Sequence, residues 1–373
     1  MPKQTLEQFC RSKEAPCFVV LVMQRYIPVD PSKLHDVHIN LSRLLSFNQC
    51  RIFGCVGARG YGKTYWFKRL ITKDFIYDNV KHVVIRDTIE ACEKVAEDGG
   101  HKFFGDIFST EKCLKGHTYN IQGTTITIDD KLAGEIIPMS AYYKYKGNYY
   151  DADDILFDEF IQESVQAYRG NRARQFANTI ETIIRARPKA RVFMTANALD
   201  LGNDILEMLD IHIKNGQFGY YINEEKKVVI YYAPDSEEFK RMKANSISGI
   251  ITKGTFLDAN LNRNEFEDAG CILFEKRKPC NIYGIYYNNE NECFRLYKSN
   301  SANEYYVCKD INANSYSYMR YVFNAKQISA NRKYANQDVR KFLSGILFNK
   351  QVKFESQYLF GVYCSIVNNT LKK

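Results

Sequence analysis

A glycine-rich octapeptide limits the fold of this chain more than any other feature. Residues 57–64 read Gly-Ala-Arg-Gly-Tyr-Gly-Lys-Thr, with an apolar run before them at 52–56 and a helix-like stretch after them at 65–71. This order is that of a P-loop, in which glycines let backbone N–H groups wrap a phosphate, the lysine reaches the β and γ phosphates, and the threonine hydroxyl ligates Mg²⁺. The residues expected at the phosphates are Gly57, Arg59, Gly60, Gly62, Lys63 and Thr64, and Thr64 is also expected at the metal.

A pair of adjacent acids gives the phosphate loop a catalytic partner. Residues 154–160 read Asp-Ile-Leu-Phe-Asp-Glu-Phe, which places Asp158 at the carboxyl end of a buried strand. From there Asp158 can hold Mg²⁺ through water, and Glu159 can polarise the attacking water. Two solvated acids could also end a strand in this way, but adjacent acids after a P-loop are more typical of ATPases. We therefore expect ATP and Mg²⁺ as the bound groups.

Two further strands end in polar residues that would reach the same site. Residues 191–197 are an apolar run that ends Thr-Ala-Asn, and such a strand usually lies beside the P-loop strand. Asn197 or Thr195 would then sense the γ-phosphate, as in additional-strand ATPases, although Thr-Ala-Asn also suits a strand-to-loop turn. Arg86, at the end of residues 82–86, is expected near the nucleotide edge of a parallel sheet, with an ordinary surface arginine as the equal alternative.

An arginine at a helix end predicts a contact to a second subunit. Residues 164–187 have helix character and many arginines, and Arg185 comes just before Pro188, which breaks the helix. A projecting arginine is what a neighbouring subunit needs to complete a phosphoryl-transfer site.

The charge of the chain favours a polyanionic partner. The formal net charge is +9, and residues 266–373 hold 16 Lys and Arg against 9 Asp and Glu. A basic domain beside an ATPase core favours nucleic acid, although basic surfaces also occur for solubility alone. Residues 141–150 interleave lysines with tyrosines, a combination that grips a nucleic-acid backbone or packs as an ordinary loop. The expected DNA-binding residues are Lys144, Lys146, Lys276, Arg277 and Lys278.

Length and composition indicate a globular protein of two domains. The chain has 373 residues, of which 45% are hydrophobic, and its apolar runs fall short of a membrane span. Eleven cysteines without a C-x-x-C pair fit reduced thiols and no structural metal. We expect a cytosolic protein with no membrane partner.

The domain prediction divides the chain into three parts. A P-loop ATPase domain covers 1–233, with an extension of unclear role at 1–45, a linker subdomain covers 234–265, and a basic α+β or α/β domain covers 266–373. A hairpin insertion is expected from strands at 118–121, 124–128 and 135–137, and the ATPase sheet ends with strands at 211–214, 218–222 and 228–232. The last domain is expected to hold strands at 271–274, 283–287, 293–297 and 305–308 and helices at 331–348 and 357–368.

Several motifs together resemble the DNA-packaging ATPase family of phi twenty-nine-like small tailed phages. They are the P-loop at 57–64, Asp-Lys-Leu-Ala-Gly at 130–134 with Ile-Pro-Met-Ser at 137–140, Phe-Asp-Glu-Phe-Ile at 157–161, and Phe-Glu-Lys-Arg at 274–277. The likeness spans both domains and leaves residues 1–45 outside it.

The resemblance implies a fold and a function. It implies an additional-strand, terminase-like α/β ATPase domain, a linker subdomain and a smaller RNase H-like α/β domain without nuclease activity. Such proteins form a pentameric ring at the phage portal and translocate double-stranded DNA into an empty capsid, and some relatives bind a packaging RNA. The protein would then be in the host cytoplasm, transiently at the portal vertex of the procapsid, and absent from the mature virion.

The family also suggests roles for single residues. Arg185 matches a trans-acting arginine finger, and Lys146 matches a lysine of the DNA-gripping pore loop. A second lysine that relatives use across the interface falls on Ile89, so Arg86 would serve instead, and a further pore lysine falls on Ser164.

Two rival functions remain open at this stage. A large terminase with a working nuclease would need three or four carboxylates that converge on metal ions. A nucleotide-dependent DNA-binding switch would lack translocation. The carboxylates available to a nuclease are Glu275, Asp310, Asp338 and Glu355.

Overall fold

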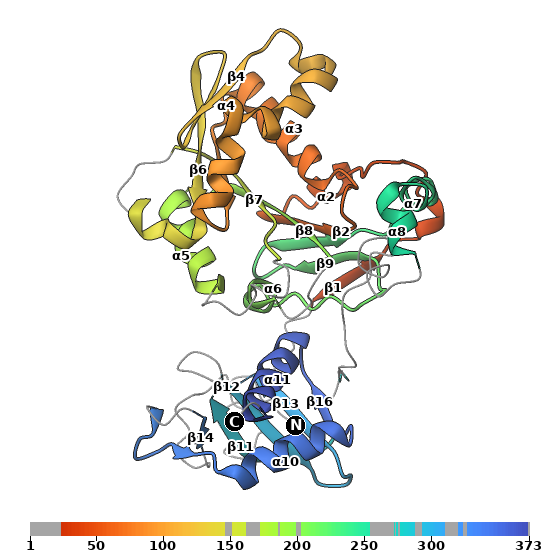
Figure 1. Cartoon of the computed structure of the whole chain (residues 1–373), viewed down its shortest axis with the longest axis vertical. Coiled ribbons are helices and arrows are strands. Elements are labelled where there is room, and N and C mark those ends of the chain that lie inside the picture. The colour runs from red at the N-terminus through yellow and green to blue at the C-terminus, as the bar shows by residue number, and fades with distance from the viewer. Residues whose placement is uncertain are drawn as a thin grey trace, which may run out of the picture.

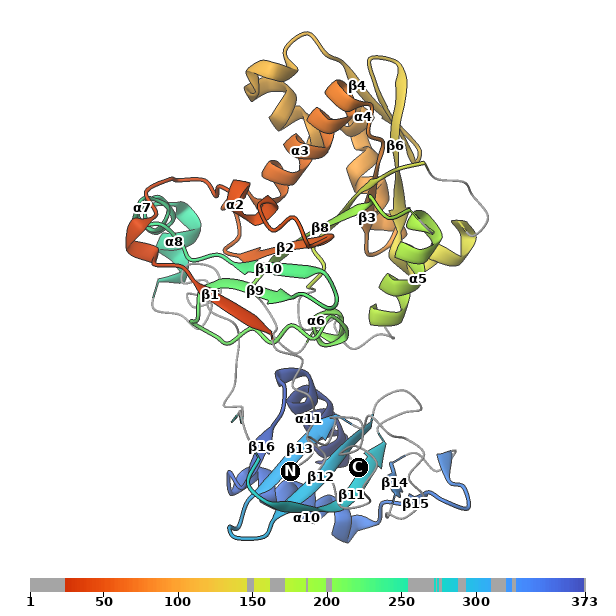
Figure 2. The same cartoon turned by 180° about the vertical axis from the view of Figure 1, so that it is seen from behind.

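The structure is a computed structural model with two β-sheets, each in its own part of the chain (Figures 1 and 2). It describes residues 24–145, 151–161, 172–185, 187–198, 203–253, 272, 274, 277–287, 293–309, 320–323 and 327–371. Among these residues, no helix has both the length and the apolar character needed to cross a membrane.

The larger sheet has ten strands and an order typical of additional-strand ATPases. Across the sheet the strands are β1 (Arg25–Pro28), β9 (Gly219–Asn223), β10 (Val228–Tyr232), β2 (Ile52–Gly57), β8 (Arg191–Asn197), β7 (Asp154–Asp158), β3 (His82–Arg86), β6 (Lys131–Pro138), β5 (Thr125–Ile128) and β4 (Tyr119–Gln122). The six strands from β10 to β6 are parallel. Strand β8 therefore separates the P-loop strand β2 from the acid-bearing strand β7, and this insertion confirms the predicted fold class.

Helices cover both faces of this sheet, so its central strands are apolar on both sides. On one face, Phe67 and Phe104 of the helices share a hydrophobic core with Phe53 and Phe193 of the strands. A second core contains the strand residue Phe157 and the helix residue Phe176. The helices of this domain are η1 (Pro31–Lys33), α2 (Ser42–Leu45), α3 (Lys63–Asp78), α4 (Ile89–Thr110), η2 (Lys112–Leu114), η3 (Met139–Tyr145), α5 (Arg172–Ile184) and α6 (Asp204–Met208).

Two predictions for this domain need correction. Residues 211–214 are not a strand, because the amide of Ile211 bonds back to Leu206 and the backbone of His212 is bonded by the side chain of Gln24 rather than by a neighbouring strand. The strands predicted as a separate hairpin insertion are part of the central sheet. The last of them, β6, pairs antiparallel with β5 and in parallel with β3. The local sequence carries no signal for such long-range pairing.

The N-terminal segment belongs to the same domain. Strand β1 pairs antiparallel with β9 at one edge of the sheet, and the amide of Ile39 donates to the carbonyl of Tyr61 in the P-loop. The part of the predicted extension that the structure describes is thus packed on the domain, whereas residues 1–23 lie outside the described residues.

The smaller sheet has the strand order of an RNase H fold. Its strands are β15 (Lys333–Tyr334), β14 (Arg320–Val322), β11 (Cys280–Tyr287), β12 (Cys293–Ser299), β13 (Tyr305–Lys309) and β16 (Val352–Phe354). β11, β12 and β13 form an antiparallel meander, and β14 and β15 extend it in parallel from β11. This arrangement confirms the expected RNase H-like domain.

Two helices supply the core of the smaller domain. α10 (Gln337–Phe348) and α11 (Gln357–Leu371) pack on Tyr286 and Phe294. α10 starts later than predicted, because Asn336 caps it by accepting from the amide of Val339 at 3.0 Å. A strand was predicted at 271–274, but its described residues, Ile272 and Phe274, do not form a regular strand. Both nevertheless exchange backbone hydrogen bonds with Phe354 of β16.

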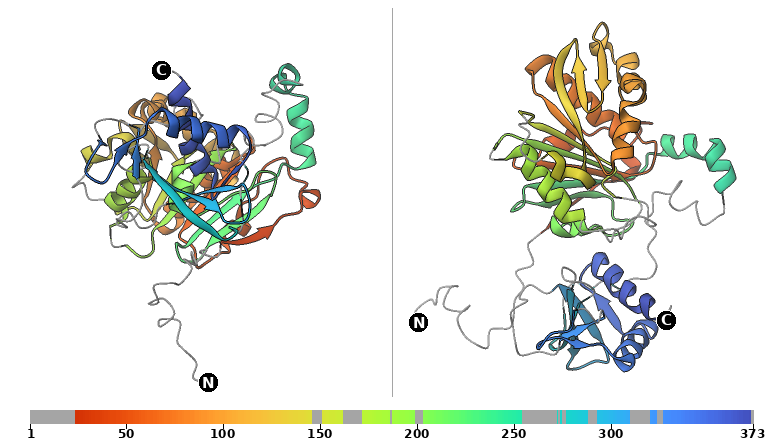
Figure 3. Two further views of the ribbon diagram at one scale, coloured as in Figure 1. Left: turned by 90° about the horizontal axis from the view of Figure 1, so that it is seen from below. Right: turned by 60° about the vertical axis from the view of Figure 1, so that its left-hand side comes forward.

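Two short helices occupy the described part of the predicted linker. α7 (Glu237–Ala244) and α8 (Ile247–Thr252) are capped by the hydroxyls of Ser236 and Ser246. Figure 3 shows this helix pair standing out from the side of the larger sheet. Residues 254–265 lie outside the described residues.

Candidate nucleotide site

The P-loop adopts a backbone that its glycines make accessible. Gly60 and Gly62 have φ of 84° and 91°, in the left-handed region that L side chains avoid. Gly57 differs from them, because an added Cβ there would make only ordinary contacts, 3.4 Å from both the Cβ and the carbonyl oxygen of Ala233. The conformation of the loop therefore depends on Gly60 and Gly62.

Lys63 starts helix α3 and is buried beneath the loop. Its Nζ donates to the carbonyl oxygens of Gly57 and Ala58, at 3.0 and 2.6 Å, and to Oδ1 of Asn197 at 3.2 Å. Burial lowers the pKa of Lys63. The P-loop lysine and the end of strand β8 are thus in direct contact, which places Asn197 at the phosphate loop.

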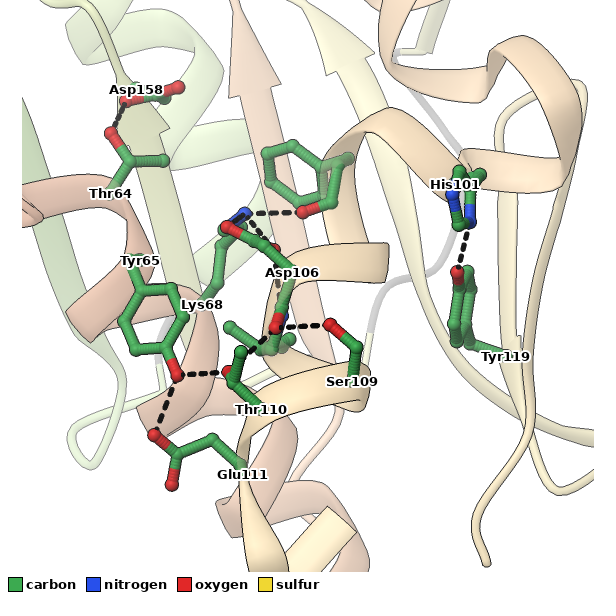
Figure 4. A network of polar contacts seen from close by, with 12 residues as sticks. Thr64, Tyr65, Lys68, His101, Asp106, Ser109, Thr110, Glu111, Tyr119 and Asp158 are labelled. Carbon is green, nitrogen blue, oxygen red and sulfur yellow. Dashed lines mark hydrogen bonds and ion pairs between the residues drawn. The ribbon is translucent and has the colours of Figure 1, made fainter. Parts of the chain in front are cut away.

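Thr64 and Asp158 bring the P-loop and the acidic strand end together. The Thr64 hydroxyl donates to Oδ1 of Asp158 at 2.7 Å, a contact that Figure 4 shows at the start of α3. Thr195 of β8 donates to the same carboxylate oxygen. A hydroxyl and a carboxylate are hard oxygen donors, and Mg²⁺ in nucleotide sites takes one or two such ligands together with phosphate and water. The residues present therefore fit Mg²⁺.

Arg86 joins the two acids. One guanidinium nitrogen donates to Oδ2 of Asp158, and Nη2 lies 3.0 Å from Oε2 of Glu159. Glu159 has a φ of 61°, and its side chain is 60% exposed. The next amide, that of Phe160, donates to the carbonyl of Thr195, which ties the turn to β8. Glu159 thus turns its carboxylate toward solvent at the mouth of the site.

An open cleft of about 250 Å³ contains most of these residues. It is lined by Arg59, Gly60, Gly62, Lys63, Thr64, Tyr65, Asp158, Glu159, Thr195, Ala196 and Asn197. Gly57 and Arg86 were also predicted at the site, but they do not line the cleft. Gly57 accepts a hydrogen bond from Lys63, and Arg86 bonds to Asp158 and Glu159. Tyr65 was not predicted at the site. Asn197 and Thr195, the two alternatives for the γ-phosphate contact, both line the cleft.

Tyr65 connects the cleft to the far end of α4. Its hydroxyl lies 2.7 Å from Oε1 of Glu111 and 2.7 Å from the hydroxyl of Thr110 (Figure 4). Arg69 pairs with the other oxygen of Glu111, and Lys68 pairs with Asp106 at 2.7 Å. These contacts join α3 to α4 behind the cleft.

Arg172, in the arginine-rich segment, has a structural partner. Its side chain is buried, and it donates to the carbonyl of Phe160 at 2.9 Å and to Asp87 at 2.8 Å. It fixes the start of α5 beside the ends of β7 and β3. An arginine-rich helix thus includes a buried ion pair that the sequence pattern alone did not indicate.

Arg185 lies at the opposite edge of the sheet from the P-loop. It follows α5, which connects the carboxyl end of β7 to the beginning of the parallel strand β8. The end of α5 therefore lies where the parallel strands begin, whereas the P-loop lies where they end. Arg185 is exposed, with a φ of 51°, and Arg187 pairs with Asp153 just before β7 at 3.5 Å. The position of Arg185 is therefore remote from the cleft of its own chain.

The predicted DNA-binding residues are only partly described. Lys144 is exposed in η3 next to the exposed Tyr143, whereas Lys146 and Lys276 lie outside the described residues. The guanidinium of Arg277 stacks 4.3 Å from the ring centre of Tyr297, and Lys278 pairs with Glu304 at 3.2 Å. The last two residues thus have partners within the domain.

The candidate nuclease carboxylates do not form a described cluster. Glu275 and Asp310 lie outside the described residues, and Asp338 is in the first turn of α10. Glu355 accepts from the amide of Lys309 at 2.7 Å, and burial raises its pKa. In the part of the chain that the structure describes, no three His, Cys, Asp or Glu residues converge as metal ligands.

The sheet order and the cleft together define a P-loop domain of the additional-strand class, joined to an RNase H-like domain. The family can then be stated. The chain belongs to the Podovirus DNA encapsidation protein (Gp16) family, whose model matches residues 34–366. The predicted resemblance is confirmed, and the match includes part of the segment 1–45 that was expected to lie outside it.

Individual relatives agree with this family. The chain is 28% identical over 237 residues to the DNA packaging protein of Bacillus phage B103, covering 63% of this chain and 70% of that protein. It is 27% identical to the DNA packaging protein of Bacillus phage phi29, covering 67% and 72%.

Two solved structures share the fold. The bacteriophage Phi-29 viral genome packaging motor assembly matches with a TM-score of 0.65 at 20% identity, over 90% of this chain and 100% of that one. The Phi-28 gp11 DNA packaging motor matches with a TM-score of 0.60 at 17% identity, over 89% and 98%.

Proposed function

We propose that this protein is an ATP-driven motor that translocates double-stranded viral DNA into a preformed capsid. The observation that carries the proposal is the 2.7 Å contact of Thr64 with Asp158, beside Glu159 in one cleft. It joins a phosphate loop to a metal-holding and a water-activating carboxylate, which are the parts that ATP hydrolysis requires. Family membership and the names of the relatives supply the DNA-packaging part of the proposal.

Each residue in the cleft has a role that follows from its chemistry. Lys63 balances charge on the β and γ phosphates, and Thr64 and Asp158 hold Mg²⁺, which neutralises charge that develops on the phosphates. Glu159 accepts the proton of the attacking water. Asn197, bonded to Lys63, senses the γ-phosphate. The nucleotide-contacting set is completed by Gly57, Arg59, Gly60, Gly62 and Arg86.

Catalysis is shared between subunits in this proposal. Because Arg185 lies at the sheet edge opposite its own P-loop, it can stabilise a transition state only in a neighbouring copy, and head-to-tail association of identical copies closes a ring. We expect a homopentamer that assembles on the portal of the procapsid in the host cytoplasm and is absent from the mature virion. A packaging RNA is a further candidate partner.

The duplex is proposed to lie in the pore of this ring. Lys144 and Lys146 grip the backbone from the ATPase domain, and the basic residues 276–278 hold it from the smaller domain. Phosphate contacts of this kind carry no base specificity, as a motor that must move any sequence requires.

One set of assays on the full-length protein separates this function from its rivals. ATP turnover is measured with and without double-stranded DNA, with a nuclease assay on the same samples in Mg²⁺ and Mn²⁺. We expect turnover that DNA stimulates and no cleavage. Metal-dependent cleavage would favour a nuclease-bearing terminase, and nucleotide-dependent DNA binding without turnover would favour a binding switch.

A further inference from the structure

The P-loop contains one residue that faces away from the cleft. Tyr61 stands between Gly60 and Gly62, both of which line the cleft, but Tyr61 does not line it and is only 2% exposed. A phosphate loop needs no aromatic ring at this position for phosphate contact, because backbone N–H groups and the lysine make the contacts. The buried ring must therefore be packed for another reason.

The ring of Tyr61 packs on the linker helix α7. Its centroid lies 4.5 Å from that of Phe239, which is completely buried. Phe239 follows Ser236, the N-cap of α7, and the carbonyl of Tyr61 accepts from the amide of Ile39 at 2.9 Å. One P-loop residue thus contacts both the linker and the N-terminal segment.

The sheet order explains why the linker meets the P-loop. β10 is the parallel neighbour of β2, so both strands end at the same edge, and the amide of Ala233 donates to the carbonyl of Val56 at 2.8 Å. The chain then passes the P-loop and enters α7 at Ser236. The Ser236 hydroxyl accepts from the amide of Phe239 and donates to the carbonyl of Asp36.

Helix α8 is fixed to α7 by close backbone packing. A Cβ at Gly249 would lie 2.1 Å from the carbonyl oxygen of Lys243, so the two helices touch with no room for a side chain. On its outer side α8 exposes Ile247, Ile250 and Ile251 at 80%, 63% and 70%. A displacement of α7 therefore carries with it an apolar surface that the described chain does not cover.

We propose that Tyr61 is a positioning residue that couples the phosphate loop to the linker helices α7 and α8 through its ring contact with Phe239. This proposal rests on the nucleotide binding in the proposed function. A bound phosphate fixes the backbone on both sides of Tyr61, and a ring in a close-packed interior transmits that constraint to its neighbour. Nucleotide at the P-loop thereby orders the pair α7–α8 that leads to the smaller domain.

Hydrogen exchange on the full-length protein, with and without Mg-ATPγS, tests this coupling. In the wild type we expect nucleotide to slow amide exchange in residues 57–64 and also in α7–α8, each by about tenfold or more. In Phe239→Leu, which keeps an apolar side chain but removes the ring, the P-loop slowing and the nucleotide affinity remain while the α7–α8 slowing is lost. In Phe239→Tyr, which keeps an aromatic ring, we expect the α7–α8 slowing to be retained. Met242→Ala, on the exposed side of α7, should behave as the wild type.

The outcomes separate the coupling from nucleotide binding itself. Slowing confined to the P-loop in the wild type, or full α7–α8 slowing in Phe239→Leu, would overturn the coupling and leave the nucleotide site intact. Absence of slowing at the P-loop would instead contradict the nucleotide binding, and the coupling with it. Should Phe239→Leu loosen α7 without nucleotide, Tyr61→Leu removes the same ring contact from the other side and is expected to give the same loss.

Discussion

The guanidinium of Arg86 lies 3.0 Å from a carboxylate oxygen of Glu159, and its other terminal nitrogen bonds to Asp158. Both acids of the proposed hydrolytic site are thus held by one cation at the end of β3. In the proposed reaction, the ion pair of Glu159 with Arg86 must open before the Glu159 carboxylate contacts the attacking water.

Replacing Glu159 by Gln is expected to separate binding from hydrolysis. The amide cannot accept the proton, whereas Lys63, Thr64 and Asp158 remain to hold Mg-ATP, so turnover falls by about 10²- to 10⁴-fold with nucleotide affinity nearly unchanged. Steady-state turnover and binding of a fluorescent ATP analogue measure the two effects. Near-normal turnover in Glu159→Gln would remove this residue from the role.

Replacing Arg86 by Gln is expected to lower turnover by at least about tenfold and to raise KM, since the cation beside Asp158 and the phosphates is lost. Arg25→Gln is the matched control, because Arg25 pairs with Glu224 on the exposed strand β1 and does not line the cleft. Equal turnover in both variants would place Arg86 outside the nucleotide site.

The position of Arg185 predicts complementation between subunits. Arg185→Ala subunits mixed with Glu159→Gln subunits should recover part of the activity, because some interfaces of the mixed ring pair an intact Glu159 with an intact Arg185. The measurement is ATP turnover across a series of mixing ratios. A monomer that hydrolyses ATP at the full rate would contradict a role of Arg185 in a neighbouring site.

The basic smaller domain predicts salt-dependent DNA binding without cleavage. Binding of the full chain to duplexes of unrelated sequence should be equally tight and should weaken steeply with salt, and Lys276→Gln should reduce the salt slope by about one. Lys240→Gln, whose lysine pairs with Glu237 in α7, is the control. Metal-dependent nicking that Glu275→Ala abolishes would instead support a nuclease.

His82 predicts how the stability of the ATPase domain changes with pH. It begins β3, is completely buried between Phe75 and Phe104, and its ring nitrogens have no hydrogen-bond partner among the described residues, so burial lowers its pKa to about 4. Below pH 6.5 the unfolded chain binds a proton at His82 that the folded chain does not bind. The free energy of unfolding therefore decreases as the pH falls from 6.5 through the folded-state pKa of about 4. We expect a loss of about 2 kcal/mol between pH 7 and pH 5.

His82→Phe should remove that part of the pH dependence, because it keeps the aromatic packing and cannot be protonated. Urea unfolding at both pH values, followed by the fluorescence of the single tryptophan, Trp66 in α3, reports on this domain. The same pH dependence in His82→Phe as in the wild type would assign the effect to other groups.

Much of the nucleotide site was determined by the sequence, because its parts are local. The P-loop needs glycines at fixed positions between a strand and a helix, and Asp158 and Glu159 end an apolar strand. Each of these two signals is contained within a few consecutive residues, so the sequence alone indicates strand, loop, helix and chemistry. The order of β2, β8 and β7 then brings them into one cleft, as the fold class predicted.

Only the tertiary structure decided what depends on pairing between distant segments. Three contacts join residues on different elements and have no local signature: the link of Arg86 to both acids, the buried pair of Arg172 with Asp87, and the ring contact of Tyr61 with Phe239. The same holds for β6, which reads as part of a hairpin but pairs in parallel with β3. Strand order and register set these contacts, because they arise from packing a sheet whose neighbours are far apart in the chain.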